Sequence, residues 1–169
     1  MRTHGKGFID ITEDLRHWLR DISARDGLLT VFVCHTSASL TIQENADPNV
    51  RRDLITTLES LAPEDAPYTH AEEGPDDMPS HIKSMLTEVS LGIPVMGGRM
   101  VLGTWQGVYL IEHRAAPHER TIALSFIGQS AGGLTSAGKA VGGRDQLMDD
   151  AGLGHGLDRA HEVVDQFVD

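Results

Sequence analysis

The apolar residues near the amino end first recur at helical spacing and then form a continuous run. Spacings of three and four residues predict a helix over residues 10–27, with Asp10 as its N-cap and Gly27 at its end. The continuous, β-branched run 28–34 follows at once, which is typical of a short buried strand. Alternating apolar and polar residues at 38–42 predict a second strand with one face in water.

Two further helices are predicted in the middle of the chain. Asp47-Pro48 provides an N-cap followed by a proline at the first helical position, and Asp77 with Pro79 repeats the pattern. A polar loop, residues 62–76, separates the two helices. The first of these helices is expected to bury a stripe formed by Val50, Leu54, Leu58 and Leu61.

The pattern changes from helix to strand after residue 90. Two short strands within 93–102 flank Gly97-Gly98, a strong hairpin signal. Residues 108–113 alternate, 121–127 form a further apolar segment, and the short loop between them predicts a second hairpin. The order of helices and strands predicts an α+β fold in a single compact domain with three helices.

The composition shifts at the carboxyl end. Residues 129–156 contain eight glycines and no aromatic residue, which is typical of a flexible linker. Residues 157–168 could form a short amphipathic helix. We therefore expect a domain at residues 1–128 and a flexible Gly-rich tail at 129–169.

The overall composition limits the kinds of partner. Hydrophobic residues make up 40% of the chain and charged residues 23%, which is typical of a globular protein. The formal net charge of −11 argues against nonspecific binding to nucleic acid, which needs a surplus of Lys and Arg. No segment approaches the roughly 20 apolar residues of a membrane span, and the amino end lacks the apolar stretch of a secretory signal. We expect a soluble cytoplasmic protein without a membrane or nucleic-acid partner.

The end of the first predicted strand carries reactive side chains. Cys34, the single cysteine, lies within the apolar run and is expected to be a buried, inert thiol. His35 follows it and precedes the hydroxyl residues Thr36 and Ser37. His35 could be a metal ligand or an acid–base group, and a structural histidine bonded to the backbone is an equal alternative.

The densest group of candidate ligands lies between His70 and His81. Two histidines and four carboxylates, Asp76 among them, occur within this short stretch, and zinc sites use such ligands. The spacing matches no short metal motif, so its specificity is low. His81 lies beside an apolar helical face, and a histidine at the edge of the core remains an alternative.

Other candidate residues are spread along the chain. Glu44 and Asn45 precede the Asp47 cap, where backbone N–H groups favour anions. Arg99 could hold a phosphate or carboxylate, and Trp105-Gln106 between glycines could line a pocket, although tryptophan more often packs in a core. Glu112 shares a strand face with apolar residues, so it is a candidate site residue or half of a buried ion pair.

Several of these segments together resemble the YjbQ family in order and spacing, over residues 7–128. The matching segments are His35-Thr36-Ser37-Ala38, Asn45-Ala46-Asp47-Pro48, Asp76-Asp77-Met78-Pro79-Ser80-His81-Ile82-Lys83 and Gly103-Thr104-Trp105-Gln106-Gly107-Val108-Tyr109. Members are also described as secondary thiamine-phosphate synthases. The resemblance implies a mixed, barrel-like sheet, assembly as a homotrimer, and a site at His35, His70 and His81, with zinc bound in some members. Many members have Asp-Asn where this chain has Asp77-Met78, and the family does not explain the Gly-rich tail.

These observations lead to one functional hypothesis and two rivals. The hypothesis is a small metal-assisted enzyme that acts on a phosphorylated small molecule, with a divalent metal, expected to be zinc, at the three histidines. As the resemblance implies, it could join hydroxymethylpyrimidine diphosphate to thiazole phosphate with loss of pyrophosphate. Glu44, Asp76 or Glu112 would supply catalytic carboxylates, and Thr36, Ser37, Asn45, Arg99, Trp105 and Gln106 would bind substrate. The rivals are a non-enzymatic trimeric module that binds a metal or metabolite, and a purely structural histidine cluster.

Overall fold

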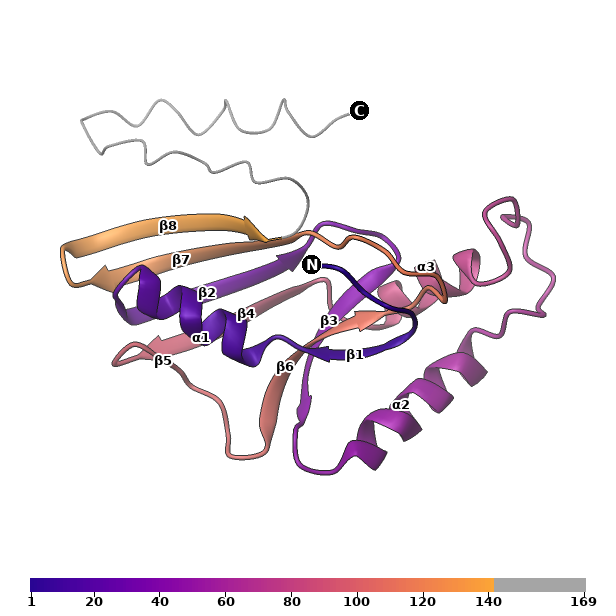
Figure 1. Ribbon diagram of the computed structural model, residues 1–169, viewed down its shortest axis with the longest axis horizontal. Coiled ribbons are helices and arrows are strands. Elements are labelled where there is room, and N and C mark those ends of the chain that lie inside the picture. Colours follow the sequence, from indigo (N-terminus) through magenta and orange to yellow (C-terminus); the bar gives the residue numbers. More distant parts are fainter. Residues whose placement is uncertain (142–169) are drawn as a thin grey trace.

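A computed structural model describes residues 1–141 of the protein, and the predicted helix at 157–168 lies outside the described residues. Residues 1–141 form two antiparallel sheets and three helices, which are arranged as in Figure 1. The elements follow one another as β1 (Gly7–Asp10), α1 (Thr12–Asp21), β2 (Ala24–Val33), β3 (Ala38–Glu44), α2 (Pro48–Leu61), α3 (Asp77–Leu86), β4 (Ser90–Met96), β5 (Arg99–Met100), β6 (Gln106–Glu112), β7 (Ile122–Ser130) and β8 (Gly133–Val141). The predicted α+β class with three helices is confirmed for this part of the chain.

The two sheets correct the expected topology. One sheet has the strand order β1-β6-β3, and the other has the order β5-β4-β2-β7-β8. Of the expected mixed or antiparallel, barrel-like sheet, the antiparallel pairing is confirmed for every strand pair within residues 1–141, whereas the two sheets do not close into a barrel. β6 and β7 lie in different sheets, so the hairpin predicted between them was wrong.

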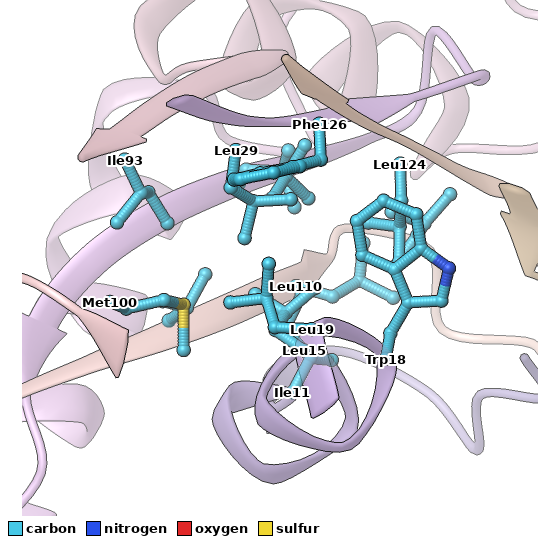
Figure 2. Close-up of a cluster of buried hydrophobic side chains, with 14 of the residues drawn as sticks. Ile11, Leu15, Trp18, Leu19, Leu29, Ile93, Met100, Leu110, Leu124 and Phe126 are labelled. Atoms are coloured by element: carbon cyan, nitrogen blue, oxygen red, sulfur yellow. The ribbon is translucent and has the colours of Figure 1, made fainter. Parts of the chain in front are cut away.

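The hydrophobic core lies between the two sheets, where α1 packs against the inner face of the larger one. Figure 2 shows α1 side chains, Trp18 and Leu19 among them, facing Leu29 and Phe126 of the larger sheet and Leu110 of the smaller one. Leu29, Leu110 and Phe126 are fully buried. Both sheets and α1 therefore share one core, which makes residues 1–141 a single packed unit.

The first helix is shorter than predicted, and the strand that follows it begins earlier. α1 ends at Asp21, and Ser23, with φ of 52°, turns the chain so that β2 begins at Ala24. β2 is buried on one face only, because Phe32 points outward between buried Val31 and Val33, and Cys34, which follows the strand, is exposed as well. The expectation of a buried Cys34 thiol was therefore wrong.

The start of the predicted linker has regular structure. Residues 129–141 complete β7 and form β8, which pairs with β7 from Ser130↔Gly133 to Ile122↔Val141. This edge strand consists mainly of small residues, so its sequence lacks the alternation by which strands are predicted. The structure differs from the predicted linker over this stretch, and the domain extends past residue 128.

Of the two helices next to the site, α2 begins where the sequence predicts, whereas α3 begins one residue earlier, with Asp77 as its first residue and Asp76, not Asp77, at the N-cap. The Asp47 carboxylate accepts a hydrogen bond from the Asn49 amide at 2.8 Å, so the N-cap of α2 is confirmed. None of the α2 side chains is fully buried, and Leu61 is 61% exposed, so the predicted buried stripe is only partly covered. The Gly97-Gly98 hairpin is confirmed, with both glycines at positive φ. No helix among residues 1–141 is long and apolar enough to cross a membrane.

Candidate functional site

Two histidines and one aspartate converge at the amino end of α3. Asp77 is the first residue of the helix, and His81 follows one turn later on the same face. His70 reaches the same point from the loop between α2 and α3. The Nε2 atoms of His70 and His81 lie 2.8 and 3.4 Å from Asp77 Oδ2, and the ligand atoms of all three residues lie within 4.8 Å of one another.

The two oxygens of Asp77 have different surroundings, although the side chain is only 3% exposed. Oδ1 accepts a hydrogen bond from Arg114, which holds the carboxylate in place. Oδ2 is buried and makes no aligned hydrogen bond within residues 1–141, even though His70 Nε2 is close by. A buried carboxylate oxygen without a donor is costly, so a bound proton or cation is expected at this point.

The orientation of His81 points to a cation. His81 Nδ1 lies 3.1 Å from the carbonyl oxygen of Thr36, an acceptor that fixes the proton on Nδ1. The Nε2 atom of a neutral His81 then carries a lone pair beside Asp77 Oδ2. Two acceptors at this distance repel each other unless a proton or a metal ion lies between them.

The donor set and its spacing fit a small divalent metal. Nitrogen and oxygen ligands of tetrahedral zinc at about 2.0–2.1 Å lie about 3.3 Å apart. The separations of 2.8 and 3.4 Å between Asp77 and the two histidines are close to this value. Three protein ligands also leave a coordination position open, which is typical of catalytic zinc sites. The half-exposed His70 side chain gives access from solvent.

Asp76 has a supporting role beside these ligands. Its Oδ2 accepts a hydrogen bond from the Ala115 amide at 2.7 Å and lies 3.3 Å from Arg114 Nε. Burial alone would raise the pKa of Asp76, but the Ala115 amide and the charge of Arg114 hold it below its usual value. Arg114, which sequence reasoning missed, donates to Asp77 and to the carbonyl of Glu73 at 2.9 Å. Arg114 thus fixes the loop and both aspartates, and Asp76 orients the site and is not placed as a general base.

His35 does not join the other two histidines. Its Nε2 accepts a hydrogen bond from the Thr121 amide at 2.8 Å, so this nitrogen is not free to bind a metal. Burial, together with the nearby positive charge of Arg120, lowers the pKa of His35. His35 is therefore held neutral, and the geometry replaces it with Asp77 in the group of possible metal ligands.

A groove next to the possible ligands has a mixed lining. It has a volume of about 660 Å³ and lies where the end of β2 meets α3. Its lining residues are Phe32, Val33, Cys34, His35, Thr36, His81, Ser84, Met85 and Val89. Of the predicted substrate-binding residues, Thr36 lines the groove, while Ser37 follows it and uses its carbonyl to accept a hydrogen bond from Arg120.

Glu112 forms a saturated buried ion pair. Arg120 donates to both carboxylate oxygens, at 2.7 and 2.6 Å, and Thr3 and the Arg114 amide donate at 2.8 and 2.9 Å. Burial alone would raise the pKa of Glu112, but these hydrogen bonds hold it below its usual value. The ion-pair alternative therefore accounts for Glu112, because no oxygen is left to act on a substrate.

The remaining predicted site residues lie elsewhere. Glu44, Trp105 and Gln106 line a separate cavity of about 490 Å³ at the far end of β3, and Asn45 bonds to the backbone of the same turn. At about 3.3 Å per residue, the length of β3 places this end about 20 Å from its start near α3. Trp105 is 66% exposed, so it is not a core residue. Arg99 is exposed on β5, at the opposite end of the molecule from α3 (Figure 1).

His113 is an example of a structural histidine in this protein. His113 is 2% exposed, and its Nε2 lies 2.8 Å from Ser39 Oγ. Burial and the neighbouring charge of Lys83 lower the pKa of His113 to about 4. The Nε2 atom of His113 is hydrogen-bonded to a hydroxyl group, whereas the Nε2 atoms of His70 and His81 face the Asp77 carboxylate.

The comparisons with known proteins agree with this fold. The model of the YjbQ-like UPF0047 family matches residues 1–129. The chain belongs to this family. The UPF0047 protein of Synechocystis sp. is 48% identical over 128 residues, which cover 75% of this chain and 87% of that relative. YjbQ of Salmonella typhimurium is 46% identical over 125 residues, which cover 73% of this chain and 91% of that protein.

Solved structures of the YjbQ-like family resemble this protein over the same region. A conserved hypothetical protein from Thermus thermophilus superposes with a TM-score of 0.64 at 36% identity, covering 75% of this chain and 99% of that one. An uncharacterized YjbQ/UPF0047 protein from Clostridium acetobutylicum gives a TM-score of 0.64 at 32% identity, with the same coverage. These likenesses establish the family and the fold, and the chemistry has to be argued from the site.

Proposed function

We propose that this YjbQ-like protein is a small metal-assisted enzyme whose divalent ion, zinc in the first instance, is held by His70, Asp77 and His81. The observation that carries the proposal is the buried Asp77 Oδ2, which lacks an aligned hydrogen bond and faces two Nε2 atoms at 2.8 and 3.4 Å. Thr36 orients His81, and Arg114 orients Asp77. Such supporting hydrogen bonds are typical of the residues around metal ligands. His35, bonded to Thr121, is left out of the ligand set.

The substrate in this proposal is a phosphorylated small molecule. A bound zinc ion with an open position would act as a Lewis acid toward a phosphoryl oxygen. The adjoining groove of about 660 Å³ is large enough for a small metabolite, and Thr36 is one of the residues that line it. The more specific form of the proposal rests on the family resemblance: hydroxymethylpyrimidine diphosphate and thiazole phosphate would be joined, with pyrophosphate as the leaving group.

The test is zinc binding by the full-length protein, produced without a histidine tag and freed of metal by a chelator. Calorimetric titration should give one zinc per chain, and His70→Ala and His81→Ala should each weaken binding by at least 100-fold. His17→Ala, a matched change at an exposed histidine on α1, should bind zinc like the wild type. Equal zinc binding by the wild type and by both site variants would refute the proposal.

Catalysis requires a separate measurement. Pyrophosphate release from the pyrimidine diphosphate and thiazole phosphate pair should depend on added zinc and should be lost in His81→Ala. If zinc binds with the expected stoichiometry and no turnover occurs with this pair or with other phosphorylated metabolites, the enzyme proposal fails and the binding-module alternative is supported.

The alternative is a non-enzymatic trimer that binds a metal or metabolite, and one observation favours assembly. The outer face of the five-stranded sheet exposes large apolar side chains, with Leu28 46% and Ile127 66% exposed. Leu28 and Ile127 are direct cross-strand partners, so they form a continuous patch of the kind that marks an interface. We propose a homotrimer in either case, for which light scattering would give three times the chain mass of 18.4 kDa.

A further inference from the structure

His35 presents one nitrogen to the protein and leaves the other one available. Its Nε2 accepts the Thr121 N–H at 2.8 Å, so this nitrogen carries no proton. A neutral imidazole has its single proton on the other nitrogen, here Nδ1, which is then a donor. No residue within 1–141 forms a hydrogen bond with His35 Nδ1. The backbone amide of Thr121, just before β7, has thus selected one tautomer and has created a fixed, uncharged donor.

The residue that carries this donor lines the groove beside the proposed metal ligands. His35 and His81 line the same cavity of about 660 Å³, and Thr36, next to His35, accepts from His81 Nδ1 at 3.1 Å. One peptide segment therefore carries the donor and orients one of the ligands. A molecule bound to an ion at His81 would lie within the same groove as His35.

Another part of the groove lining is apolar and exposed to solvent. Met85 is 78% exposed, Phe32 44% and Val89 39%, and all three line this cavity. Large apolar side chains grouped around a polar site are typical of small-molecule pockets, where they bind the non-polar part of a ligand. The groove therefore combines an uncharged donor, a set of metal ligands and an apolar wall.

We propose that His35 is a substrate-binding donor, and that the groove takes an oxyanion that carries an apolar organic group. In this assignment Nδ1–H of His35 donates to one oxygen of the anion, and a second oxygen faces the ion at His70, Asp77 and His81. The organic group lies against Phe32, Met85 and Val89. The proposal rests on the proposed metal site for the second oxygen, whereas the role of His35 as a donor does not depend on a metal.

The tautomer of His35 can be measured without any metal. In metal-free, full-length protein labelled with ¹⁵N-histidine, the His35 ring should show a protonated Nδ1 and an unprotonated Nε2 at neutral pH. The assignment comes from the signals that disappear in His35→Gln. A protonated Nε2, or an imidazolium, would overturn the proposal whatever the outcome for zinc.

The ligand class can be tested with two phosphonates that share a head group. Phenylphosphonate and methylphosphonate differ only in the organic group, so zinc-loaded protein should bind the phenyl compound about tenfold more tightly. Met85→Ser should reduce this preference and leave the zinc affinity unchanged. Equal binding of the two compounds by the wild type would overturn the apolar part of the proposal. A change in oligomer mass for Met85→Ser, with the preference intact, would assign this wall to a second copy and also overturn it.

Two substitutions separate the two nitrogens of His35. His35→Gln can keep an acceptor for the Thr121 amide near the position of Nε2 but loses the donor at Nδ1. His35→Asn keeps a donor near Nδ1 and loses the acceptor. Because hydrogen bonds to charged groups are strong, His35→Gln should weaken phenylphosphonate binding at least tenfold, and His35→Asn should recover most of it.

The result for zinc in these variants distinguishes the two proposals. Unchanged zinc affinity in His35→Gln, with weakened phenylphosphonate binding, is the expected result. Loss of zinc in His35→Gln would make His35 a ligand and would overturn the donor role. Wild-type phenylphosphonate binding in His35→Gln would overturn it as well. Absence of zinc binding in the wild type, with the tautomer as expected, would count against the metal site alone.

Discussion

Asp77 and Glu112 are both buried carboxylates beside an arginine, yet their oxygens differ in how fully they are bonded. The two oxygens of Glu112 accept four hydrogen bonds, two from Arg120, one from Thr3 and one from the Arg114 amide. Asp77 has one oxygen bonded to Arg114, and the other has no aligned donor. Both are almost fully buried, so burial does not distinguish them.

Under the proposed function, the difference separates a carboxylate that stabilises the fold from one that holds a metal ion. In Glu112 every lone pair is directed at a donor of the protein, so the side chain holds β6, the amino end and Arg120 together. In Asp77 one buried oxygen makes no aligned hydrogen bond within the described chain, although His70 Nε2 lies 2.8 Å from it, so its burial cost is not fully offset. A residue in such a state is expected to contribute to stability only after its ligand has bound.

The largest effect should come from Glu112→Gln. The substitution leaves the buried guanidinium of Arg120 without its charge partner and places an amide N–H₂ group against other donors. Breaking a buried ion pair in this way costs about 3–5 kcal/mol of unfolding free energy. Denaturant unfolding measures this loss. Glu119→Gln, at an exposed position nearby, should change stability by less than about 0.5 kcal/mol. Similar stabilities for the two variants would contradict the assigned role of Glu112.

Asp77→Asn should change the stability of the metal-free protein little but abolish its stabilisation by zinc. Without metal, the new amide can donate to His70 Nε2, and Arg114 keeps its contacts with Asp76 and Glu73, so we expect stability within about 1 kcal/mol of the wild type. Zinc at 100 times its dissociation constant should stabilise the wild type by about 2.7 kcal/mol, and this gain should disappear in the variant. Thermal unfolding with and without zinc measures both quantities. A zinc-dependent gain that survives in Asp77→Asn would place the metal elsewhere.

Much of the fold follows from local signals in the sequence. The Asp47-Pro48 cap and the Gly97-Gly98 hairpin depend on neighbouring residues only, and both are confirmed. β1 and β8 were missed because one has only four residues and the other consists mainly of small ones. These strands exist because β6 and β7 present unpaired edges to them, and the sequence of a strand does not reveal such long-range pairing.

The site was predictable in part for the same reason. The stretch from His70 to His81 was found because its ligand residues are close in sequence. The structure does not place His35 with them, and spacing along the chain could not show this, because the Thr121 amide that bonds to its Nε2 atom is distant in sequence. Arg114 gave no signal, because its importance comes from long-range contacts with Asp76, Asp77 and Glu73.

The smallest effect, and the one that links the two carboxylates, should come from Arg114→Lys. The backbone amide of Arg114 bonds to Glu112 and is unchanged by the substitution, whereas its guanidinium orients Asp77. A lysine ammonium cannot bridge two carboxylates and a carbonyl in the same plane. Loss of such a supporting contact weakens metal binding by about 10–100-fold, so we expect about tenfold weaker zinc binding with little loss of stability. Arg52→Lys on the exposed side of α2 should leave zinc affinity unchanged. Equal zinc affinities for Arg114→Lys and the wild type would mean that zinc binding does not depend on the orientation of Asp77 by Arg114. The difference between Asp77 and Glu112 would then not be explained by metal binding.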